Sequence, residues 1–470
     1  MSRRAGNSQN KLMFIDPAEF TPQFSWEKCA RDPDLEHVVC EGVDLVATAT
    51  SFGTPTYVYS RAAIAKAYGE FDSGLAGIPH TICFAVKSNG NLSLLNDLAK
   101  QGSGFDIVSG GELEHLGHLG VRGDRIVFSG VGKTRHEIRD ALQYAAGGGR
   151  KLKRTKSGIL LFNVESEAEL EVLREEAERH VKRGGKIPSV AIRVNPDVAA
   201  GGHPHIATGR HTHKFGLDWP EARRLYLAHK DAKYFRWKGI SAHIGSQIVS
   251  LEPFRKAFQR IAGFVADLRR AGIELEYLDI GGGLGVRYTT EKIPSRSEYA
   301  RMVAQLVQPL GLHLLLEPGR SIIAASSVLL TRVIYTKRNR GKTFVVVDAA
   351  MNDLLRPALY GAVHPITRIA RAAGETKVST ERVDIVGPVC ETGDCLLHKW
   401  PLGEVRPGDV LAIWVAGAYG MTQASNYNAR TRASEVLIDG TRTKLSRRRE
   451  TQDDLLRTDV MAPRKGPGIR

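Results

Sequence analysis

Eight short apolar segments rich in β-branched residues recur along the middle of the chain, and most of the stretches between them are long enough to form a helix. A strand followed by such a crossover, repeated eight times, is the pattern of a (β/α)8 barrel of the TIM type. The predicted strands are residues 82–87, 105–109, 126–129, 158–164, 190–195, 239–244, 277–280 and 312–316. The sequence therefore predicts an α/β fold whose main body is this barrel.

Reactive side chains occur where the predicted strands stop. In barrels of this type, the C-terminal ends of the strands form the active face. One amine, one imidazole, a glycine triplet and a carboxylate should therefore converge there, and we expect an enzyme. The residues at the strand ends are Lys87, Asp106, Ser109, Asn163, Arg193, His243, residues 281–283 and Glu317.

The chain on either side of the barrel predicts a second domain, a mostly antiparallel β sheet. After Arg320, apolar β runs separated by turn residues occur at 328–335, 343–347, 383–386 and 410–415. The first part of the chain, with a hairpin-like piece at 38–45, should join this sheet, because a closed barrel has no free edge. The predicted division is 1–55 joining the β domain, 56–324 as the barrel, 325–440 as the C-terminal β domain and 441–470 as a basic, mobile tail.

The formal net charge of +15, from 66 Lys and Arg against 51 Asp and Glu, raises the question of a nucleic-acid partner. Much of the excess lies in residues 150–156 and in the tail after Thr441. Neither segment interleaves aromatic with basic residues, as a surface for stacking bases would. A solvated basic surface is therefore favoured over nucleic-acid binding.

Other features of the composition bear on location and metals. No apolar run is long enough for a membrane span, and the start of the chain has no apolar signal-peptide region. The five cysteines are scattered and form no C-x-x-C pair, so neither a zinc knuckle nor a disulfide framework is expected. We expect a cytoplasmic protein with no membrane partner and no metal.

Three glycine-containing motifs are similar to nucleotide-binding signatures but lack a required glycine. Residues 129–134 and 341–343 each end in Gly-Lys-Thr, yet Val127 and Thr336 stand where a P-loop needs its first glycine. Residues 279–285 follow a predicted strand, but Val286 stands where a dinucleotide-binding motif needs its third glycine. ATP hydrolysis and dinucleotide binding are therefore disfavoured.

Lys87 and the glycine triplet each have two interpretations. Lys87 ends an apolar strand, so it either snorkels to the rim or is a Schiff-base lysine whose pKa is lowered by burial. The glycine loop is either a tight turn or a set of bare N–H groups that a phosphate can approach. It follows predicted strand seven, where barrels often bind phosphate, and Glu317 follows strand eight. Together they indicate pyridoxal 5'-phosphate, with its phosphate at Gly283 and its pyridine nitrogen at Glu317.

Two further residues admit both a structural and a functional interpretation. His243 is either a core histidine or a flat ring packed against the cofactor, beside which Ser246 would donate to the phosphate. Cys390 is either an inert buried cysteine or a proton donor. The neighbouring Glu391 would raise the thiol pKa, which favours a protonated acid over a thiolate nucleophile.

Seven motifs between about residues 40 and 435 resemble, in the same order, those of the fold-type III pyridoxal-phosphate decarboxylases, and among these the diaminopimelate decarboxylases. They are residues 84–89, 104–112, 243–247, 279–285, 317–320, 390–394 and 417–419. The resemblance implies pyridoxal 5'-phosphate bound covalently to Lys87, a ring covered by His243, and Cys390 as the acid that reprotonates the carbanion after CO2 leaves. The cofactor-binding set is then Lys87, His243, Ser246, Gly283, Glu317, Gly319, Arg320 and Tyr419.

The resemblance also implies an assembly and a substrate. Family members are homodimers in which the cysteine segment reaches into the partner's barrel, so each active site is shared. The implied reaction is decarboxylation of meso-2,6-diaminopimelate to L-lysine and CO2, the last step of lysine biosynthesis. Arginines would grip the distal carboxylate and a glutamate would balance the ammonium. The implied substrate-binding residues are Arg320, Arg356, Tyr360, Glu391 and Tyr419.

Alternatives within the same fold stay open. Ornithine and arginine decarboxylases typically carry an aspartate after the motif cysteine, whereas this chain has Glu391. The basic residues 147–156 and the long basic tail depart from the family pattern and leave a paralogue of another pathway open. An alanine-racemase-like enzyme would need a tyrosine acid instead of the Cys390 segment. A non-catalytic cofactor-binding barrel would lack the second domain and Cys390.

Overall fold

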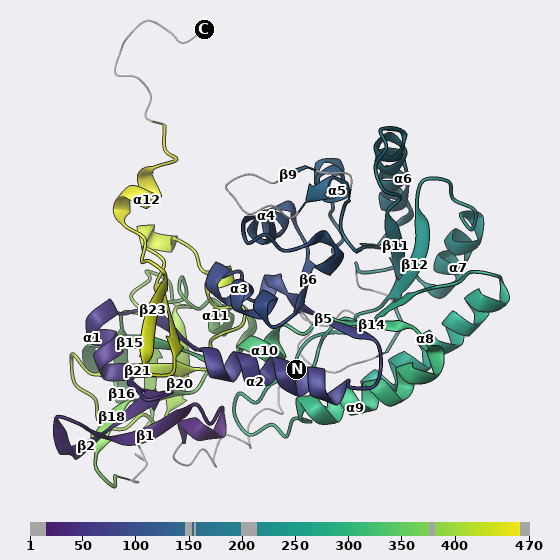
Figure 1. Cartoon of the computed structure of the whole chain (residues 1–470). Helices are drawn as coiled ribbons and strands as arrows, with labels where there is room; N and C mark the ends of the chain where they lie inside the picture. The colour runs from purple at the N-terminus through teal and green to yellow at the C-terminus, as the bar shows by residue number, and fades with distance from the viewer. Residues whose placement is uncertain (1–15, 146–152, 155–156, 199–213, 376–380, 461–470) are drawn as a thin grey trace, which may run out of the picture.

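The eight predicted strands form one closed parallel barrel in chain order (Figure 1). The computed structural model describes residues 16–145, 153–154, 157–198, 214–375 and 381–460. The barrel closes where Leu316 of the last strand pairs with Ile82 of the first. The strands are β5 (His80–Ala85), β6 (Gly104–Ile107), β7 (Ile126–Phe128), β10 (Leu161–Val164), β11 (Ser189–Arg193), β12 (Arg236–Ser241), β13 (Tyr277–Asp279) and β14 (His313–Leu316). The predicted barrel is confirmed.

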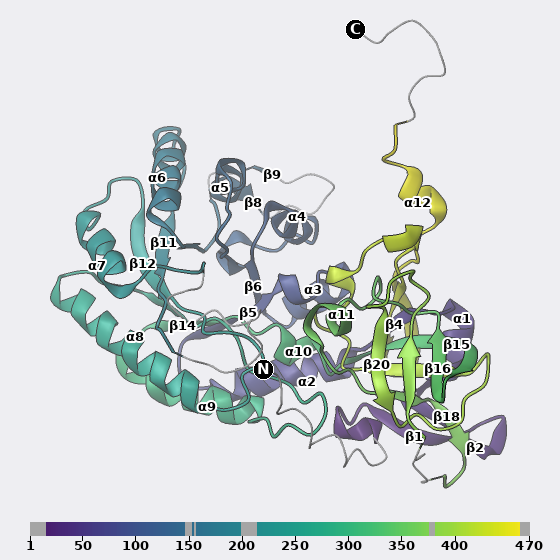
Figure 2. The same cartoon turned by 180° about the vertical axis from the view of Figure 1, so that it is seen from behind.

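Helices surround the barrel on its outer side (Figures 1 and 2). Five of them start at a Ser, Thr or Asp whose side chain accepts a hydrogen bond from the amide of a Glu three residues later, as good N-caps do. The helices are α2 (Arg61–Gly74), α3 (Leu92–Lys100), α4 (Gly110–His118), α5 (Arg135–Leu142), α6 (Glu167–Lys182), α7 (Trp219–Ala228), α8 (Glu252–Arg270) and α9 (Arg296–Val307), with the short α10 (Arg320–Ile323) after β14.

The inside of the barrel has an apolar layer and a polar layer. Cys83, Val127, Leu161, Ala191 and Leu315 form a small buried cluster that is separate from the main core. Further along the strands, buried polar side chains take over, and they include Asp106, Asn163 and Asp279. The polar layer lies toward the C-terminal ends of the strands, where the active face was predicted.

The second domain is a mixed, mostly antiparallel sheet of nine strands beside the barrel (Figures 1 and 2). The parallel pairs are β16 with β19 and β4 with β22. The strands are β4 (Thr56–Ser60), β15 (Ser327–Asn339), β16 (Lys342–Val347), β17 (Ile366–Arg368), β19 (Val383–Val386), β20 (Cys395–Trp400), β21 (Val410–Trp414), β22 (Ser434–Asp439) and β23 (Arg442–Arg447). Four of these, β15, β16, β19 and β21, match the predicted apolar runs.

The N-terminal part of the chain forms a small sheet with a strand from the C-terminal half. Its strands are β1 (Phe24–Cys29), β2 (Asp32–Cys40), β3 (Val43–Asp44) and β18 (Ala370–Ala372), and β2 pairs with β18. The hairpin expected at 38–45 is present as β2 and β3. The remaining elements are α1 (Leu45–Phe52), α11 (Arg356–Tyr360), α12 (Gln452–Leu456), β8 (Tyr144–Ala145) and β9 (Lys153–Arg154).

Two predicted boundaries are wrong. Residues 56–60 were assigned to the barrel, but β4 lies between β15 and β22 in the middle of the large sheet. Residues 441–460 were expected to be mobile, but β23 extends that sheet and α12 follows it. The charged sequence of β23 did not predict a strand. It is nevertheless compatible with an edge strand, because an edge strand pairs with only one neighbour and can expose most of its side chains to solvent. Residues 461–470 and most of the basic segment 150–156 lie outside the described residues.

Among the described residues, no helix is both long and apolar enough to cross a membrane.

The buried carboxylate of Glu435 is paired with a residue of β23, so we expect this strand to contribute to stability. Glu435 has 0% exposure and accepts hydrogen bonds from Tyr59 Oη at 2.8 Å and Asn91 Nδ2 at 2.9 Å, and it pairs with the Arg447 guanidinium of β23. We expect Arg447→Ala to lower the free energy of unfolding by about 1–3 kcal/mol, because it removes a charged partner from a buried carboxylate. Urea unfolding measures this. Arg442→Ala removes another exposed arginine of the same strand that is not paired with Glu435, so it is the matched control, and equal effects of the two substitutions would contradict the assignment.

Candidate functional site

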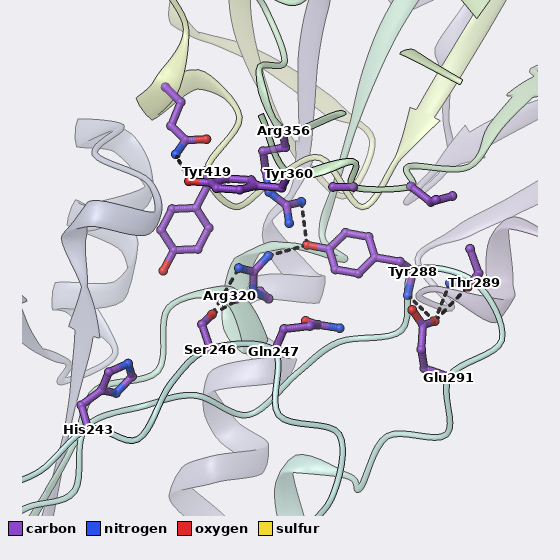
Figure 3. A pocket seen from close by; sticks show the side chains of 13 residues that line it. His243, Ser246, Gln247, Tyr288, Thr289, Glu291, Arg320, Arg356, Tyr360 and Tyr419 are labelled. Atoms are coloured by element: carbon purple, nitrogen blue, oxygen red, sulfur yellow. Dashed lines mark hydrogen bonds between the residues drawn. The ribbon is translucent and has the colours of Figure 1, made fainter. Parts of the chain in front are cut away.

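A cavity of about 420 Å³ lies between the C-terminal ends of the barrel strands and the sheet domain (Figure 3). The barrel side contributes the loops after β12 and β13 and the start of α10. The sheet-domain side contributes α11 and the turn after β21. The lining residues are His243, Ser246, Gln247, Tyr288, Thr289, Glu291, Arg320, Arg356, Tyr360, Ala362, Val363, Tyr419 and Gln423. Six of the predicted site residues are among them: His243, Ser246, Arg320, Arg356, Tyr360 and Tyr419.

Lys87 lies beside this cavity, in a short 3-10 turn (Val86–Ser88) directly after β5 and not within the strand as predicted. Its Nζ lies 2.6 Å from Asp106 Oδ2 of the neighbouring strand β6. Burial disfavours the ammonium, but the carboxylates of Asp106 and Glu317 outweigh burial and raise the pKa of Lys87 above its ordinary value. The expectation that burial would lower the pKa of Lys87 is therefore wrong for this structure. The sequence did not reveal that two carboxylates lie next to the lysine.

A chain of buried hydrogen bonds fixes the acidic groups on the barrel axis. Asn163 Nδ2 donates to Asp279 Oδ2 at 2.6 Å and to Ser129 Oγ at 3.1 Å, and Ser129 Oγ donates to Glu317 Oε1 at 3.2 Å. Burial and then the neighbouring carboxylates Asp106 and Asp279 raise the pKa of Glu317 well above its ordinary value. Glu317 therefore favours its protonated form, although the positive charge of Lys87 acts in the opposite direction.

His243 follows β12 and points toward the cavity (Figure 3). Its Nδ1 accepts a hydrogen bond from the backbone N–H of Gly282 at 3.2 Å, which leaves the ring proton on Nε2. Burial, followed by the charges of Arg193 and Lys87, lowers the pKa of His243 well below its ordinary value. The ring is therefore neutral at physiological pH and presents an uncharged flat face.

The glycine loop brings bare backbone close to the β12 loop and to Glu317. Gly283 has φ +114°, and a Cβ added there would lie 2.5 Å from the carbonyl oxygen of Gly245. A Cβ on Gly282 would lie 2.2 Å from the carbonyl oxygen of Glu317. Only glycine fits both positions. The loop thus has the close packing that requires glycine, and the N–H groups of Gly281 and Gly282 already donate to Asp279 Oδ1 at 2.9 Å and His243 Nδ1 at 3.2 Å.

Two buried arginines share one phenol oxygen at the centre of the cavity (Figure 3). Arg320 Nη1 and Arg356 Nη1 donate to Tyr288 Oη at 2.7 Å and 3.0 Å. Arg320 also donates from Nε and Nη2 to Ser246 Oγ at 3.3 Å and 3.2 Å. His364 Nε2 accepts a further hydrogen bond from Arg356 Nη1 at 2.7 Å. The cluster positions two guanidinium groups for an anionic ligand.

Cys390 and Glu391 are not brought to this cavity. Both are exposed, in a loop of the sheet domain between β19 and β20. The backbone N–H of Cys390 donates to Asn428 Oδ1 at 2.8 Å. The loop is braced by the buried Asp394, whose carboxylate accepts from the amides of Met351 at 2.7 Å and Val389 at 2.8 Å. It is therefore a firmly held loop that projects its cysteine outward.

Other candidate residues have structural roles. Lys133, from the Gly-Lys-Thr motif, is buried and donates to the carbonyl oxygens of Gly130 and Asn163, both at 2.7 Å, and to Glu169 Oε1 at 2.8 Å. Its three donors are satisfied, which explains why the motif is no phosphate site. Ser109 caps α4, and Arg193 pairs with Glu165 at 2.9 Å.

Within the part of the chain that the structure describes, two groups of side chains elsewhere have the composition of metal ligands. They are Cys29, His37 and Asp44 in the small sheet and Asp384, Cys395 and His398 on β19 and β20. In each group the carboxylate already has a partner: His37 Nδ1 lies 2.7 Å from Asp44 Oδ2, and Lys342 Nζ lies 2.6 Å from Asp384 Oδ2. None of the six residues lines the cavity.

Comparison with known proteins agrees with this geometry. Residues 61–324, which span the barrel, match the family model described as pyridoxal-dependent decarboxylase, pyridoxal binding domain. The chain belongs to the pyridoxal-dependent decarboxylase family. The resemblance noted from the sequence motifs is therefore confirmed.

Individual members of this family are similar over nearly their full length. The chain is 46% identical over 433 residues to diaminopimelate decarboxylase of Pseudomonas aeruginosa, covering 92% of this chain and 98% of that protein. The structure of diaminopimelate decarboxylase from Helicobacter pylori complexed with L-lysine has a TM-score of 0.80 at 38% identity, covering 88% and 98%. The M. jannaschii enzyme in co-complex with L-lysine has a TM-score of 0.80 at 36% identity, covering 91% and 96%.

Sequence reasoning missed several residues of this decarboxylase site. Tyr288 joins the two arginines but lies in the long loop after β13, with no strand end or motif to mark it. His364 and Gln423 come from sheet-domain segments without a recognisable pattern. Asp279 closes β13 and begins the glycine motif, so its position at a strand end was the available signal.

The buried His364 should make the decarboxylase less stable in acid. Burial and the charge of Arg356 lower the pKa of His364 well below its ordinary value, so the folded state cannot take up the proton that the unfolded chain binds near pH ~6.5. The contribution of the neutral His364 to the free energy of unfolding is therefore fully present above pH ~6.5. Below that pH the free energy of unfolding falls by about 1.4 kcal/mol for each pH unit. We expect His364→Gln to reduce the loss between pH 7.5 and 5.5 by about 1.4 kcal/mol in urea unfolding. The exposed His136→Gln is the control, and an unchanged pH slope in His364→Gln would contradict a neutral His364.

Proposed function

We propose that this protein is a pyridoxal-phosphate-dependent carboxy-lyase that converts meso-2,6-diaminopimelate to L-lysine and CO2, the last step of lysine biosynthesis. The observation that carries the proposal is the buried pair Arg320 and Arg356, each only 6% exposed, in the cavity next to Lys87 and His243. Two buried guanidiniums need an anionic partner, and diaminopimelate carries a distal carboxylate that ornithine and arginine lack. The similarity to diaminopimelate decarboxylases supports the same assignment.

The residues at the mouth of the barrel fit pyridoxal 5'-phosphate. Asp106 Oδ1 and Asn163 Oδ1 are buried and have no hydrogen-bond partner among the described residues. The carboxyl groups of Asp106 and Asp279 both interact with Glu317, whereas Lys87 supplies a single positive charge, so the site favours a further positive group. A protonated pyridine nitrogen beside Glu317 would supply it and would restore the carboxylate form of that side chain.

When bound, pyridoxal phosphate supplies a ring that accepts the electron pair left by the departing CO2. Lys87 would hold the cofactor covalently, and the neutral face of His243 would lie against the ring without competing for its charge. Gly283, Gly319, Ser246 and the side of Arg320 nearest Ser246 would bind the phosphate, together with Tyr419.

The far end of the substrate would bind at the sheet-domain side of the cavity. Arg356 would bind the distal carboxylate, and the Tyr360 hydroxyl, which accepts from Gln423 Nε2 at 3.4 Å, would orient it. Arg320 lies between the phosphate side and the carboxylate side and can serve both. Glu391 would balance the distal ammonium.

We further propose that the active enzyme is a homodimer with shared sites. Cys390 would protonate the carbanion and Glu391 would contact the substrate, yet neither lines the cavity of its own chain. Their loop is firmly braced and exposed, which suits insertion into the cavity of a second copy. Each cavity then receives its acid from the partner subunit.

The substrate assignment is tested by following CO2 release from the protein loaded with cofactor. We expect release from meso-diaminopimelate, with L-lysine as product, and little from ornithine or arginine. Lys87→Ala should lose both turnover and the borohydride-reducible link to the cofactor. A preference for ornithine or arginine would refute the substrate assignment and leave a related decarboxylase in its place.

Truncation of Arg356 should impair the use of diaminopimelate specifically. Losing a hydrogen bond to a charged group costs about 1.5–3 kcal/mol, so kcat/KM should fall roughly 10–150-fold. Any weak activity on ornithine should change far less, because that substrate has no distal carboxylate. Arg356→Lys keeps the positive charge but loses the bidentate geometry of the guanidinium. Its kcat/KM for diaminopimelate should therefore lie between those of wild type and Arg356→Ala. A uniform loss on all substrates would indicate that Arg356 supports the fold only.

Mixing two inactive variants tests the shared site. Lys87→Ala lacks the cofactor lysine, and Cys390→Ala should lose about 10²–10⁴-fold in turnover by removing the acid. After subunit exchange, heterodimers contain one site with both residues intact, so activity should reappear. Exchange is followed by tagging one variant, and proven exchange without recovery would rule out a shared site.

A further inference from the structure

We propose that Tyr288 is a positioning and specificity-determining residue: its hydroxyl holds Arg320 and Arg356 in place and directs its own proton to the distal carboxylate of the substrate. This inference rests on the proposed function and deepens it. It assigns a role to a residue that lies outside every motif of the sequence.

The first support is the position of the phenol oxygen between two like charges. Tyr288 Oη accepts from Arg320 at 2.7 Å and from Arg356 at 3.0 Å, so both guanidiniums are fixed by one atom (Figure 3). The ring adds to this, because the Arg356 guanidinium lies 5.1 Å from its centroid. Two buried cations repel each other, and the electron-rich phenol lets them stay close.

The second support is the hydrogen-bond capacity of a phenol. A phenol oxygen has two lone pairs and one proton. Both lone pairs are used by the arginines, so the remaining O–H is free to donate, and Tyr288 lines the cavity. A carboxylate placed there would meet three donors: the two guanidiniums and the phenol. An alkylammonium end, such as either end of cadaverine, would find no acceptor in this set.

The third support is His364, which fixes the orientation of Arg356 through a second hydrogen bond. Its Nδ1 lies 3.0 Å from the carbonyl oxygen of Trp414, so that nitrogen carries the proton and Nε2 accepts from Arg356 at 2.7 Å. The His364 ring also meets Tyr288 edge to face, with centroids 5.2 Å apart at 79°. His364 and Tyr288 therefore form one unit that sets the direction of the Arg356 guanidinium.

Ionisation of Tyr288 gives the role a pH signature. Burial raises the pKa of the phenol, but the charges of Arg320 and Arg356 outweigh burial and lower it below its ordinary value. The neutral phenol donates to a carboxylate, whereas the phenolate repels it and competes for the same guanidiniums. Affinity for diaminopimelate should therefore fall as pH rises through this pKa. The other charged or titratable groups around the phenol and the cavity are Arg320, Arg356, His364, His243, Glu291, Tyr360 and Tyr419.

The kinetic test compares wild type with Tyr288→Phe, in which every one of those other groups is retained. We expect KM for meso-diaminopimelate to rise about tenfold with kcat within about threefold, and the inhibition constant of cadaverine, which has no carboxylate, to change less than about twofold. KM of the wild type should increase as pH rises toward the ordinary tyrosine range near pH ~10, and KM of the variant should not. Tyr299→Phe removes another buried phenol, on α9 away from the cavity, and should behave as wild type. Equal weakening of diaminopimelate and cadaverine, or the same pH trend in both proteins, would overturn the inference.

A spectroscopic test separates this inference from the proposed function. Tyrosinate absorbance is recorded while the folded holoenzyme is titrated toward high pH, without substrate. We expect one tyrosine equivalent to ionise below the ordinary range near pH ~10 in wild type and Tyr299→Phe, and this step to be missing in Tyr288→Phe. Identical titrations of all three proteins would overturn the inference whatever the substrate is. Failure of wild type to release CO2 from diaminopimelate would instead overturn the proposed function.

Discussion

The site depends on the contact between two turns, one from each domain. The backbone N–H of Tyr419, after β21, donates to the carbonyl oxygen of Ser88 at 2.9 Å, and Asn89 Nδ2 donates to the carbonyl oxygen of Gly417 at 3.0 Å. Tyr419 adopts φ +57°, which is unfavourable for a residue with a side chain. This contact brings the Tyr419 ring beside Arg320, at 5.0 Å, and next to the turn that carries Lys87. The contact therefore joins the barrel half of the cavity to the sheet-domain half.

Charge is arranged along the cavity in a way that separates two binding tasks. Carboxylates are buried on the barrel axis around Lys87, and guanidiniums are buried on the side that faces the sheet domain. Buried charges are costly unless they are paired, so each group has fixed partners: Asn163 for Asp279, and Tyr288 for the two arginines. A ligand with a positive ring at one end and a carboxylate at the other matches both groups. The polarity of the cavity thus orients a bound molecule before any chemistry occurs.

The sequence predicted the barrel well because its strands repeat at regular intervals and are buried on both faces, which produces apolar runs. It also predicted β15, β16, β19 and β21 of the second sheet. It failed at the positions where pairing is non-local. The neighbours of β4 come from residues 327–330 and 434–438, and the charged β23 has only one strand partner. No local pattern encodes such partners.

The site residues divide in the same way. Residues at strand ends or in motifs, such as Lys87, His243 and Arg320, could be predicted, because the barrel topology fixes where strand ends meet. The raised pKa of Lys87 and the bridging role of Tyr288 could not, because both follow from side chains brought together only by folding. Cys390 was found by its motif, yet it lies on an exposed loop outside the cavity of its own chain. A motif identifies a chemical group, whereas folding decides where that group lies, and in the proposed homodimer the fit between the surfaces of two copies would decide in which cavity it acts.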